Sequence, residues 1–207
     1  DEKAIESSYM GTVFSSDEKF LYRTGEIRSV VDDRERNMRE DIKEWFNPKI
    51  DSSLIIHGAG AIRQVGRFIL FQNVAQLKNQ ITAKFNRIKN GDNNIVYMFV
   101  FSGISGGTGS GSFIDMGYIL KSIAESCQIR QITRLLFAFM PDVNLQHIGT
   151  TGPAADIIKR NGFTALKELD YLNNLRAHGT RYTVNYGSDV AVDEIAPPYE
   201  TTLLFSA

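Results

Sequence analysis

The stretch VYMFVFSGISGGTGSGSFIDMGYIL, residues 96–120, decides the fold of this chain of 207 residues. It contains six of the 17 glycines, and five of them lie between a strongly apolar run and a segment with helical periodicity. Glycine loses more backbone freedom on folding than any other residue, so such a cluster needs a local cause. Two causes compete: a bound ligand that approaches the backbone closely, and tight packing between neighbouring elements.

The elements on either side of the glycines follow a strand–helix–strand pattern. Residues 95–101 are too uniformly apolar for a half-exposed strand and suit a parallel sheet that is covered on both faces. Residues 112–127 carry apolar side chains at helical spacing, and residues 132–140 read as a second buried strand that ends at Pro141. The order predicts a βαβ unit, and hence an α/β fold with a mainly parallel sheet.

The rest of the chain adds helices and strands around this unit. Residues 68–88 repeat apolar side chains every three or four positions, which predicts a long helix with one buried stripe. The other expected elements are an amphipathic helix at 36–46, a loop at 141–153, a second long helix at 151–175 with a break near Gly162, strands at 181–187 and 201–206, and strand-like pieces at 19–33.

Composition and charge narrow the class of protein. The net charge of -1 and the pI near 6.4 give no broad positive field, so a nucleic-acid partner is not expected. No apolar run approaches the roughly 18 residues of a membrane span, and the single Cys127 fits a reducing cytoplasm. The length suits one domain over residues 1–207, and the strand-like run at 200–207 leads us to expect an incomplete one.

The glycine segment has the chemistry of a phosphate site if it lies at the amino end of the following helix. Unpaired amides and the positive end of the helix dipole attract phosphate there. Successive amides in a glycine turn can form an anion-binding nest, because no Cβ blocks the approach of the oxygens. The hydroxyls of Thr108, Ser110 and Ser112 add further donors.

Three designs of phosphate loop compete for this segment. A P-loop needs Lys and then Ser or Thr after its last glycine, whereas Gly111 is followed by Ser112 and Phe113. A dinucleotide loop needs G-x-G-x-x-G and a later acid, whereas the glycines at 107–111 are spaced by two and Asp115 lies within the helix. The third design is a lysine-free nest of glycine amides.

SGGTGSG, residues 105–111, resembles the glycine-rich signature with which tubulin and its bacterial homologue FtsZ cradle the phosphates of GTP, although Ser105 departs from the usual glycine triplet. GAGAIRQVGR, residues 58–67, is similar to the FtsZ loop that approaches the γ-phosphate. RNGFTALKELDYL, residues 160–172, is similar to the helix that offers an arginine and polar groups to the nucleotide. The chain most resembles the divergent bacterial tubulin-like proteins, over roughly residues 54–206.

This resemblance implies a Rossmann-like three-layer sandwich of the tubulin/FtsZ nucleotide-binding type, with GTP as ligand and Mg²⁺ on its phosphates. It also implies head-to-tail self-assembly, in which the neighbouring subunit brings the acid that activates water. No catalytic residue is therefore assigned, and GTPase activity is expected if the full-length protein carries the catalytic loop. The nucleotide-binding residues implied are Gly58, Ala59, Gly60, Arg67, Gly106, Gly107, Thr108, Gly109, Ser110, Gly111, Asp142 (in place of the usual ribose-binding acid), Arg160 and Asn161.

Other interpretations stay open at this point. The glycines at 106–111 would also permit close packing, Gly58 and Gly60 would also form a turn, and Arg67 would also pair within the protein. Asp115 suits the helix dipole as well as magnesium, and the three histidines are scattered without a second metal ligand at hand. At the level of function, the alternatives are a non-hydrolysing tubulin-fold scaffold with weak or no nucleotide binding and, more distantly, an NAD-dependent oxidoreductase.

Overall fold

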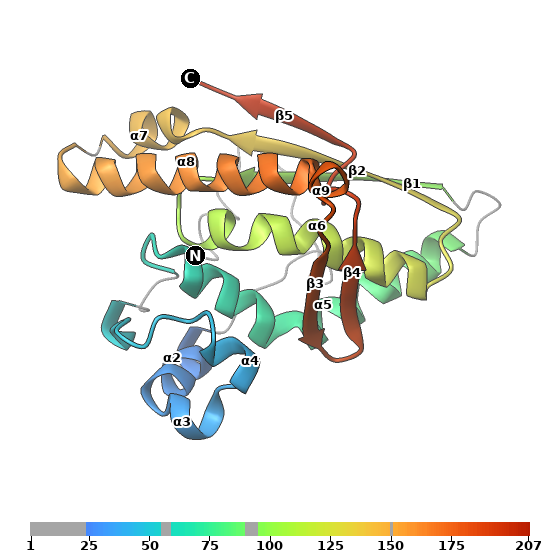
Figure 1. Ribbon diagram of the computed structural model, residues 1–207, viewed down its shortest axis with the longest axis horizontal. Helices are drawn as coiled ribbons and strands as arrows, with labels where there is room; N and C mark the ends of the chain where they lie inside the picture. Colours follow the sequence, from blue (N-terminus) through green and yellow to red (C-terminus); the bar gives the residue numbers. More distant parts are fainter. Residues whose placement is uncertain (1–23, 55–58, 90–94, 150) are drawn as a thin grey trace, which may run out of the picture.

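The computed structural model describes residues 24–54, 59–89, 95–149 and 151–207 of the chain (Figure 1). Its helices are α2 (Thr24–Asp32), α3 (Arg34–Asn37), α4 (Glu40–Lys43), the 3₁₀ helix η1 (Ser52–Leu54), α5 (Arg63–Lys89), α6 (Thr108–Ser126), α7 (Pro141–Ile148), α8 (Pro153–Asn173) and α9 (Leu175–His178). Its strands are β1 (Ile95–Gly103), β2 (Gln131–Phe139), β3 (Tyr182–Gly187), β4 (Val190–Glu194) and β5 (Thr201–Phe205). None of the described helices is long and apolar enough to cross a membrane.

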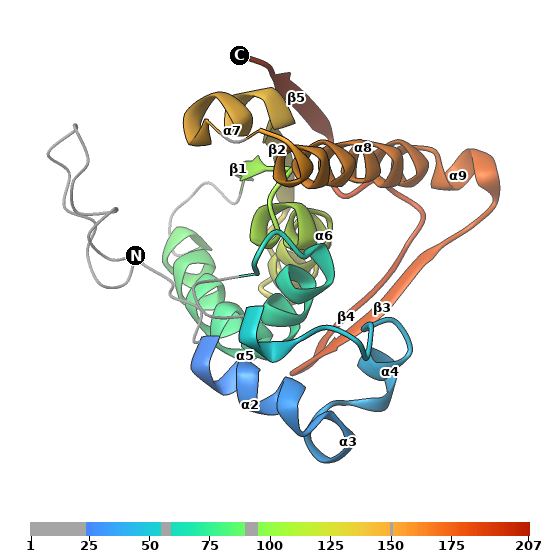
Figure 2. The same cartoon turned by 90° about the vertical axis from the view of Figure 1, so that its left-hand side faces the viewer.

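Strands β1, β2 and β5 form a parallel sheet in the order β1-β2-β5 (Figure 2). β1 and β2 pair over their whole length, from Ile95 opposite Gln131 to Gly103 opposite Phe139. Helix α6 connects these two strands, as a crossover between parallel neighbours requires. The predicted βαβ unit and the mixed α/β fold are therefore confirmed.

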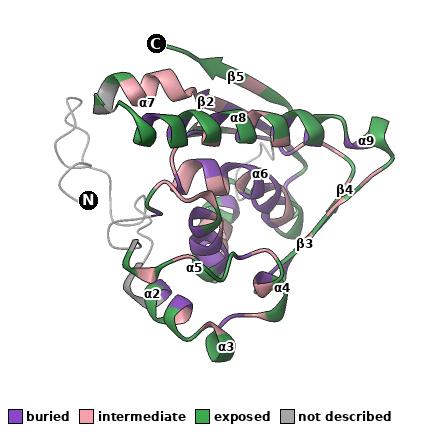
Figure 3. Cartoon of the chain, turned by 60° about the vertical axis from the view of Figure 1, so that its left-hand side comes forward, coloured by how far each residue is buried: buried purple, intermediate pink, exposed green. Residues whose placement is uncertain are grey.

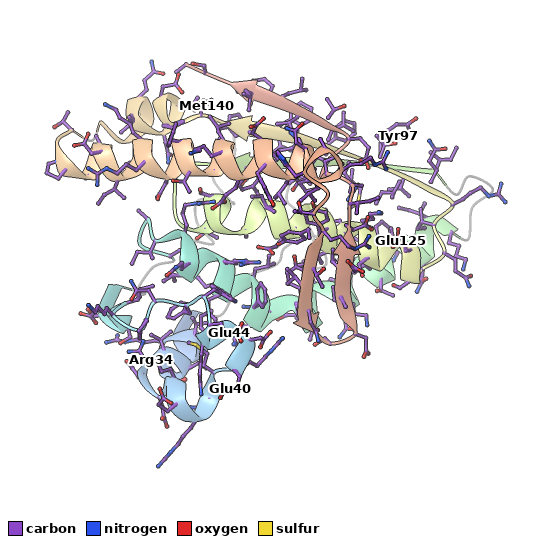
Figure 4. All side chains as sticks on the ribbon, viewed as in Figure 1. Arg34, Glu40, Glu44, Tyr97, Glu125 and Met140 are labelled. Atoms are coloured by element: carbon purple, nitrogen blue, oxygen red, sulfur yellow. The ribbon has the colours of Figure 1, made fainter. Side chains whose placement is uncertain are left out.

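The two faces of this sheet have different surroundings. Leu136 and Ala138 of β2 are fully buried on the face that packs on α6. On the other face, Tyr97, Phe99 and Phe101 of β1 are each more than half exposed, and Tyr97 projects away from α6 (Figure 4). The sequence predicted a sheet that is covered on both faces. This prediction is wrong for the described part of the chain, which covers only the face that packs on α6.

Helix α5 forms the centre of the hydrophobic core, packed along α6 (Figure 3). The prediction of a long helix is confirmed, although α5 begins earlier than expected, at Arg63. The prediction of one buried stripe is wrong, because the first half of α5 is buried on nearly all sides, as at Val65, Ile69 and Leu70, while Ile88 is exposed. The predicted apolar positions that are buried in the structure are Phe68, Phe71, Val74, Leu77 and Phe85.

The first described segment is helical where short strand-like pieces were expected. Residues 24–32 form α2, so that prediction is wrong for them, and residues 19–23 lie outside the described part. Ile27 and Val31 are both buried. Their spacing of four residues places them on one side of a helix, which a strand would not do.

The single helix expected at 36–46 is interrupted between α3 and α4. Met38 and Arg39 have extended backbone there. The guanidinium of Arg39 donates to the carbonyl oxygens of Asn185 and Tyr186 on β3, at 2.8 Å each. These hydrogen bonds replace one helical turn. Helix propensity is only a weak local preference, and charge-assisted hydrogen bonds of this kind outweigh it.

Helices α7 and α8 differ from expectation in two places. Residues 141–148 were expected to be a loop but form α7, which begins at Pro141, a position where proline costs no hydrogen bond. Helix α8 continues without a break through Gly162. A Cβ at Gly162 would collide with the ring of Pro141, so this glycine permits the two helices to approach each other.

Strands β3 and β4 form a separate antiparallel hairpin beside α5 and α6 (Figure 1). β3 matches the strand predicted at 181–187, whereas β4 was not predicted. The ring of Tyr182 stacks on Tyr118 of α6 with centroids 4.4 Å apart, and Tyr186 lies 4.9 Å from Phe71 of α5. Aromatic contacts therefore attach the hairpin to the two central helices.

Candidate functional site

The glycine segment lies between the carboxyl end of β1 and the amino end of α6, as the sequence predicted. Ile104 and Ser105 are fully buried at its start. The amide of Ile104 donates to the carbonyl oxygen of Phe139 at 3.1 Å. This bond fixes the first residue of the turn to the end of the neighbouring strand β2.

The backbone amides of residues 105–110 have no hydrogen-bond acceptor within the described part of the chain. The next amide, of Gly111, donates to the carbonyl oxygen of Gly107 at 3.0 Å and closes the first turn of α6. No side chain caps this helix at Gly107. The unpaired donors coincide with the positive end of the helix dipole, so the arrangement can bind an anion.

Three of the four predicted glycines also have a packing role. A Cβ added to Gly107, Gly109 or Gly111 would collide with atoms of β1, α5 or the loop before α5. For Gly107 the nearest such atom is the Cβ of buried Ala59, at 2.6 Å. Gly106 is the exception, because its added Cβ would have no atom within 4 Å and its φ is not positive. Packing therefore accounts for the other three glycines but not for Gly106.

The second predicted motif, residues 58–67, lies directly beside the first. Gly58 is outside the described residues, and Gly60 and Ala61 have φ of 54° and 60°. The side-chain amide of Asn161 on α8 donates to the carbonyl oxygen of Ala61 at 2.8 Å and to that of Ser105 at 3.1 Å. Asn161 thus holds the two motifs together, a role that was not foreseen for it.

The two other polar residues predicted for the site lie in different surroundings. Arg160 precedes Asn161 on α8 and is exposed, with no ion pair among the described residues. Asp142, in the first turn of α7, accepts hydrogen bonds from the hydroxyl of Ser206 and from the amide of Ala207, the latter at 2.9 Å. These bonds lower the pKa of Asp142 below its ordinary value, the Ser206 bond contributing most.

Arg67 and Asp115, which were predicted with alternative roles, bind each other. Nε of Arg67 lies 2.9 Å from Oδ2 of Asp115 and Nη2 lies 3.0 Å from Oδ1. The hydroxyls of Tyr182 and Tyr186 also donate to Oδ1, at 2.5 and 2.7 Å. Burial lowers the pKa of Arg67, but the charge and hydrogen bonds of Asp115 outweigh it, so this pKa is raised. Both residues therefore have a structural partner.

The surroundings of Asp115 do not favour a metal ion. Its carboxylate is 3% exposed and already accepts bonds from three side chains. Over the ranges that the structure describes, no group of three His, Cys, Asp or Glu side chains is placed to hold a metal. Burial, followed by the negative charge of Asp115, raises the pKa values of Tyr182 and Tyr186.

Sequence reasoning missed the side chains that support the glycine turn. Nε of Arg63 donates to the hydroxyl of Ser110 at 2.8 Å, and its guanidinium pairs with both oxygens of Glu168. The amide of Asn144 donates to the hydroxyl of Ser105 at 3.1 Å. These partners lie 47, 105 and 39 positions apart in the sequence. No local pattern can reveal contacts at such separations.

Comparison with known proteins identifies the family. A family model described as tubulin-like matches residues 2–207, nearly the whole chain. Comparisons with curated proteins and with solved structures find no match. The matched range includes both glycine motifs and helix α8, the segments that carried the resemblance in the sequence. The chain therefore belongs to the tubulin-like family.

Proposed function

We propose that this chain is the Rossmann-like nucleotide-binding domain of a tubulin-like GTPase, and that the amides of the turn before α6 hold the phosphates of GTP. The observation that carries the proposal is the set of amides at residues 105–110 without acceptors in the described part of the chain. A helix amino end with several unpaired amides is a site where phosphate binds without a lysine.

Gly106 adds a second line of support. Its added Cβ would meet no protein atom, and its backbone does not need the left-handed region. Neither packing nor turn geometry therefore requires a glycine at this position. Close approach of a ligand to the backbone is a further cause that favours glycine, and it fits a phosphate above the turn.

The supporting contacts would fix the turn before a ligand arrives. Asn161 binds the carbonyls of Ala61 and Ser105, and Asn144 binds the hydroxyl of Ser105. Preorganised donors bind more tightly because little ordering is left to the binding step. In this proposal the amides of 105–110 and the hydroxyl of Thr108 hold phosphate, and exposed Arg160 supplies a positive charge.

Hydrolysis would depend on a second subunit. Residues 103–111 contain no carboxylate, and nearby Asp115 is committed to Arg67 and two tyrosines. We therefore propose, from the family, head-to-tail assembly in which the neighbouring subunit brings the acid that activates water. Mg²⁺ would be held mainly through the phosphates, whose charge it would neutralise.

One observation favours an alternative function. Gly107, Gly109 and Gly111 each allow a close contact that a Cβ would prevent. Packing alone would therefore explain most of these glycines, without any ligand. The chain would then be a tubulin-fold scaffold that binds nucleotide weakly or not at all. The two functions differ in one measurable property, the affinity for GTP.

Isothermal titration calorimetry of the purified protein with GTP, ATP and NAD tests the proposal. We expect one GTP bound per chain and no binding of NAD, since the turn lacks the dinucleotide pattern. Light scattering with and without GTP would then report assembly. Absence of heat with every nucleotide would contradict the proposal and support the scaffold, and binding of NAD alone would support an oxidoreductase.

A further inference from the structure

A cavity of about 780 Å³ lies between α5, the first half of α6 and α8. Trp45 and Tyr182 complete its wall. Small-molecule sites typically have volumes of about 300–1,000 Å³. Of the residues proposed for phosphate, only Ser110 lines this cavity, so the cavity adjoins the end of that turn and extends away from it between the helices. Nothing in the proposed function occupies it.

The wall of the cavity has one positive charge in excess. Its charged side chains are three cations and two carboxylates. Glu168 is bound to Arg63, and Asp115 is bound to Arg67, each through both carboxylate oxygens. Lys167 is the remaining cation, and its ammonium has no carboxylate partner among the residues that the structure describes. An anionic group in the cavity would therefore find one uncompensated charge.

Two aromatic residues flank this lysine along α8. Phe163 and Tyr171 stand four residues before and after Lys167, so the three share one face of α8. Phe163 is 65% exposed and Tyr171 47% exposed, and the Tyr171 ring also stacks on His178, so ring area remains open to a ligand mainly at Phe163. The Lys167 ammonium lies 5.6 Å from the centroid of the Phe163 ring. The indole of Trp45 lines the cavity as well.

We propose that this cavity binds a flat aromatic molecule that carries a single negative charge, such as an aromatic carboxylate or sulfonate. Its ring system lies against Phe163, Tyr171 and Trp45, and its anionic group faces Lys167. The single unpaired lysine sets this class of ligand. A triphosphate would bring more negative charge than one unpaired lysine can balance, and a neutral ring would gain no electrostatic attraction from it.

The chain carries a built-in reporter for this site, because Trp45 is its single tryptophan. The probe is 1-anilinonaphthalene-8-sulfonate, an aromatic sulfonate with one charge. We expect it to quench Trp45 emission by energy transfer with saturation at one site. Lys167→Glu reverses the charge at an exposed position without touching the core, and we expect it to weaken binding about tenfold.

Two further variants test whether the dye binds in the cavity rather than through general charge attraction or nonspecific apolar contact. Lys159→Glu makes the same charge change at another exposed position of α8 that does not line the cavity, so binding should stay within about twofold. Phe163→Ser removes a ring that is already exposed and should weaken binding as Lys167→Glu does.

Quenching that is unchanged in both Lys167→Glu and Phe163→Ser would overturn the proposal. Such a result would place the dye elsewhere, for example on the exposed aromatic face of β1. Equal weakening by Lys159→Glu and Lys167→Glu would also overturn it, because the charge effect would then be general. Gly106 does not line the cavity, so Gly106→Asp, which is designed to weaken GTP binding, should leave dye binding unchanged.

Discussion

Arg67 on α5 and Asp115 on α6 form a bidentate ion pair, with N–O distances of 2.9 and 3.0 Å. The pair joins the helix that follows one glycine motif to the helix that follows the other. Tyr182 and Tyr186 bring the β3–β4 hairpin into the same network. A single buried carboxylate thus connects three elements that are distant in sequence.

Asp115→Asn should lower the free energy of unfolding by about 3 kcal/mol, because it leaves the partly buried Arg67 guanidinium without a counter-charge. Urea unfolding followed by circular dichroism measures this. Asp33→Asn is the matched control, since Asp33 pairs with Arg36 at 3.9 Å in solvent and should contribute nothing measurable. A loss no larger than that of the control would contradict the assigned role of Asp115.

Gly66→Ala should destabilise the protein by about 1–3 kcal/mol, because its Cβ would collide with the carbonyl group of Gly107 and separate α5 from the turn. Gly106→Ala is the comparison, and its unfolding transition should remain near that of the wild type. Thermal unfolding of both variants measures the difference. Equal stability of the two would mean that the close contact between α5 and the turn is absent in solution.

The tyrosines around Asp115 should ionise only at strongly alkaline pH. Burial raises the pKa values of Tyr118, Tyr182, Tyr186 and Tyr199 above the ordinary 10.0, and Asp115 adds to this effect. Because the folded-state pKa is raised, the stability is present below pH 10 and is lost as the pH rises further. Spectrophotometric titration should show only part of the eight tyrosines ionising before the protein unfolds.

Acid should weaken the contact between Glu200 and Arg134, a guanidinium only 2% exposed. Burial raises the pKa of Glu200, but hydrogen bonds and charge from Arg134 outweigh it, so this pKa lies below the ordinary 4.5. The resulting stability is present above pH 4.5 and is lost as the pH falls through the folded-state value. Glu200→Gln should therefore reduce stability at neutral pH and flatten its decrease in acid, as denaturant titrations at several pH values would show.

The elements that sequence predicted well are those defined by local periodicity. The apolar run of β1, the helical spacing in α5 and the glycine turn between β1 and α6 each carry their signal within a few residues. The turn in particular could be placed at a helix amino end from its neighbours alone. The family, too, was recognisable from the motifs at 58–67 and 105–111.

The elements that sequence missed depend on distant partners. The break between α3 and α4 follows from bonds between Arg39 and β3, and the continuity of α8 depends on Pro141 beside Gly162. The cavity likewise forms only when α5, α6 and α8 come together. The protein partners of Arg67 and Asn161, two predicted nucleotide contacts, likewise come from distant segments, namely Asp115 on α6 and the carbonyl group of Ala61.

Gly106 offers the most direct measurement of the central claim, that amides before α6 hold the phosphates of GTP. Gly106→Asp and Gly106→Asn add side chains of equal size into open space, and only the first adds a charge, which the helix dipole tolerates. By calorimetry, we expect the Asn variant to bind GTP within about threefold of the wild type and the Asp variant at least about tenfold more weakly. Equal GTP affinity of the Asp and Asn variants would contradict the account.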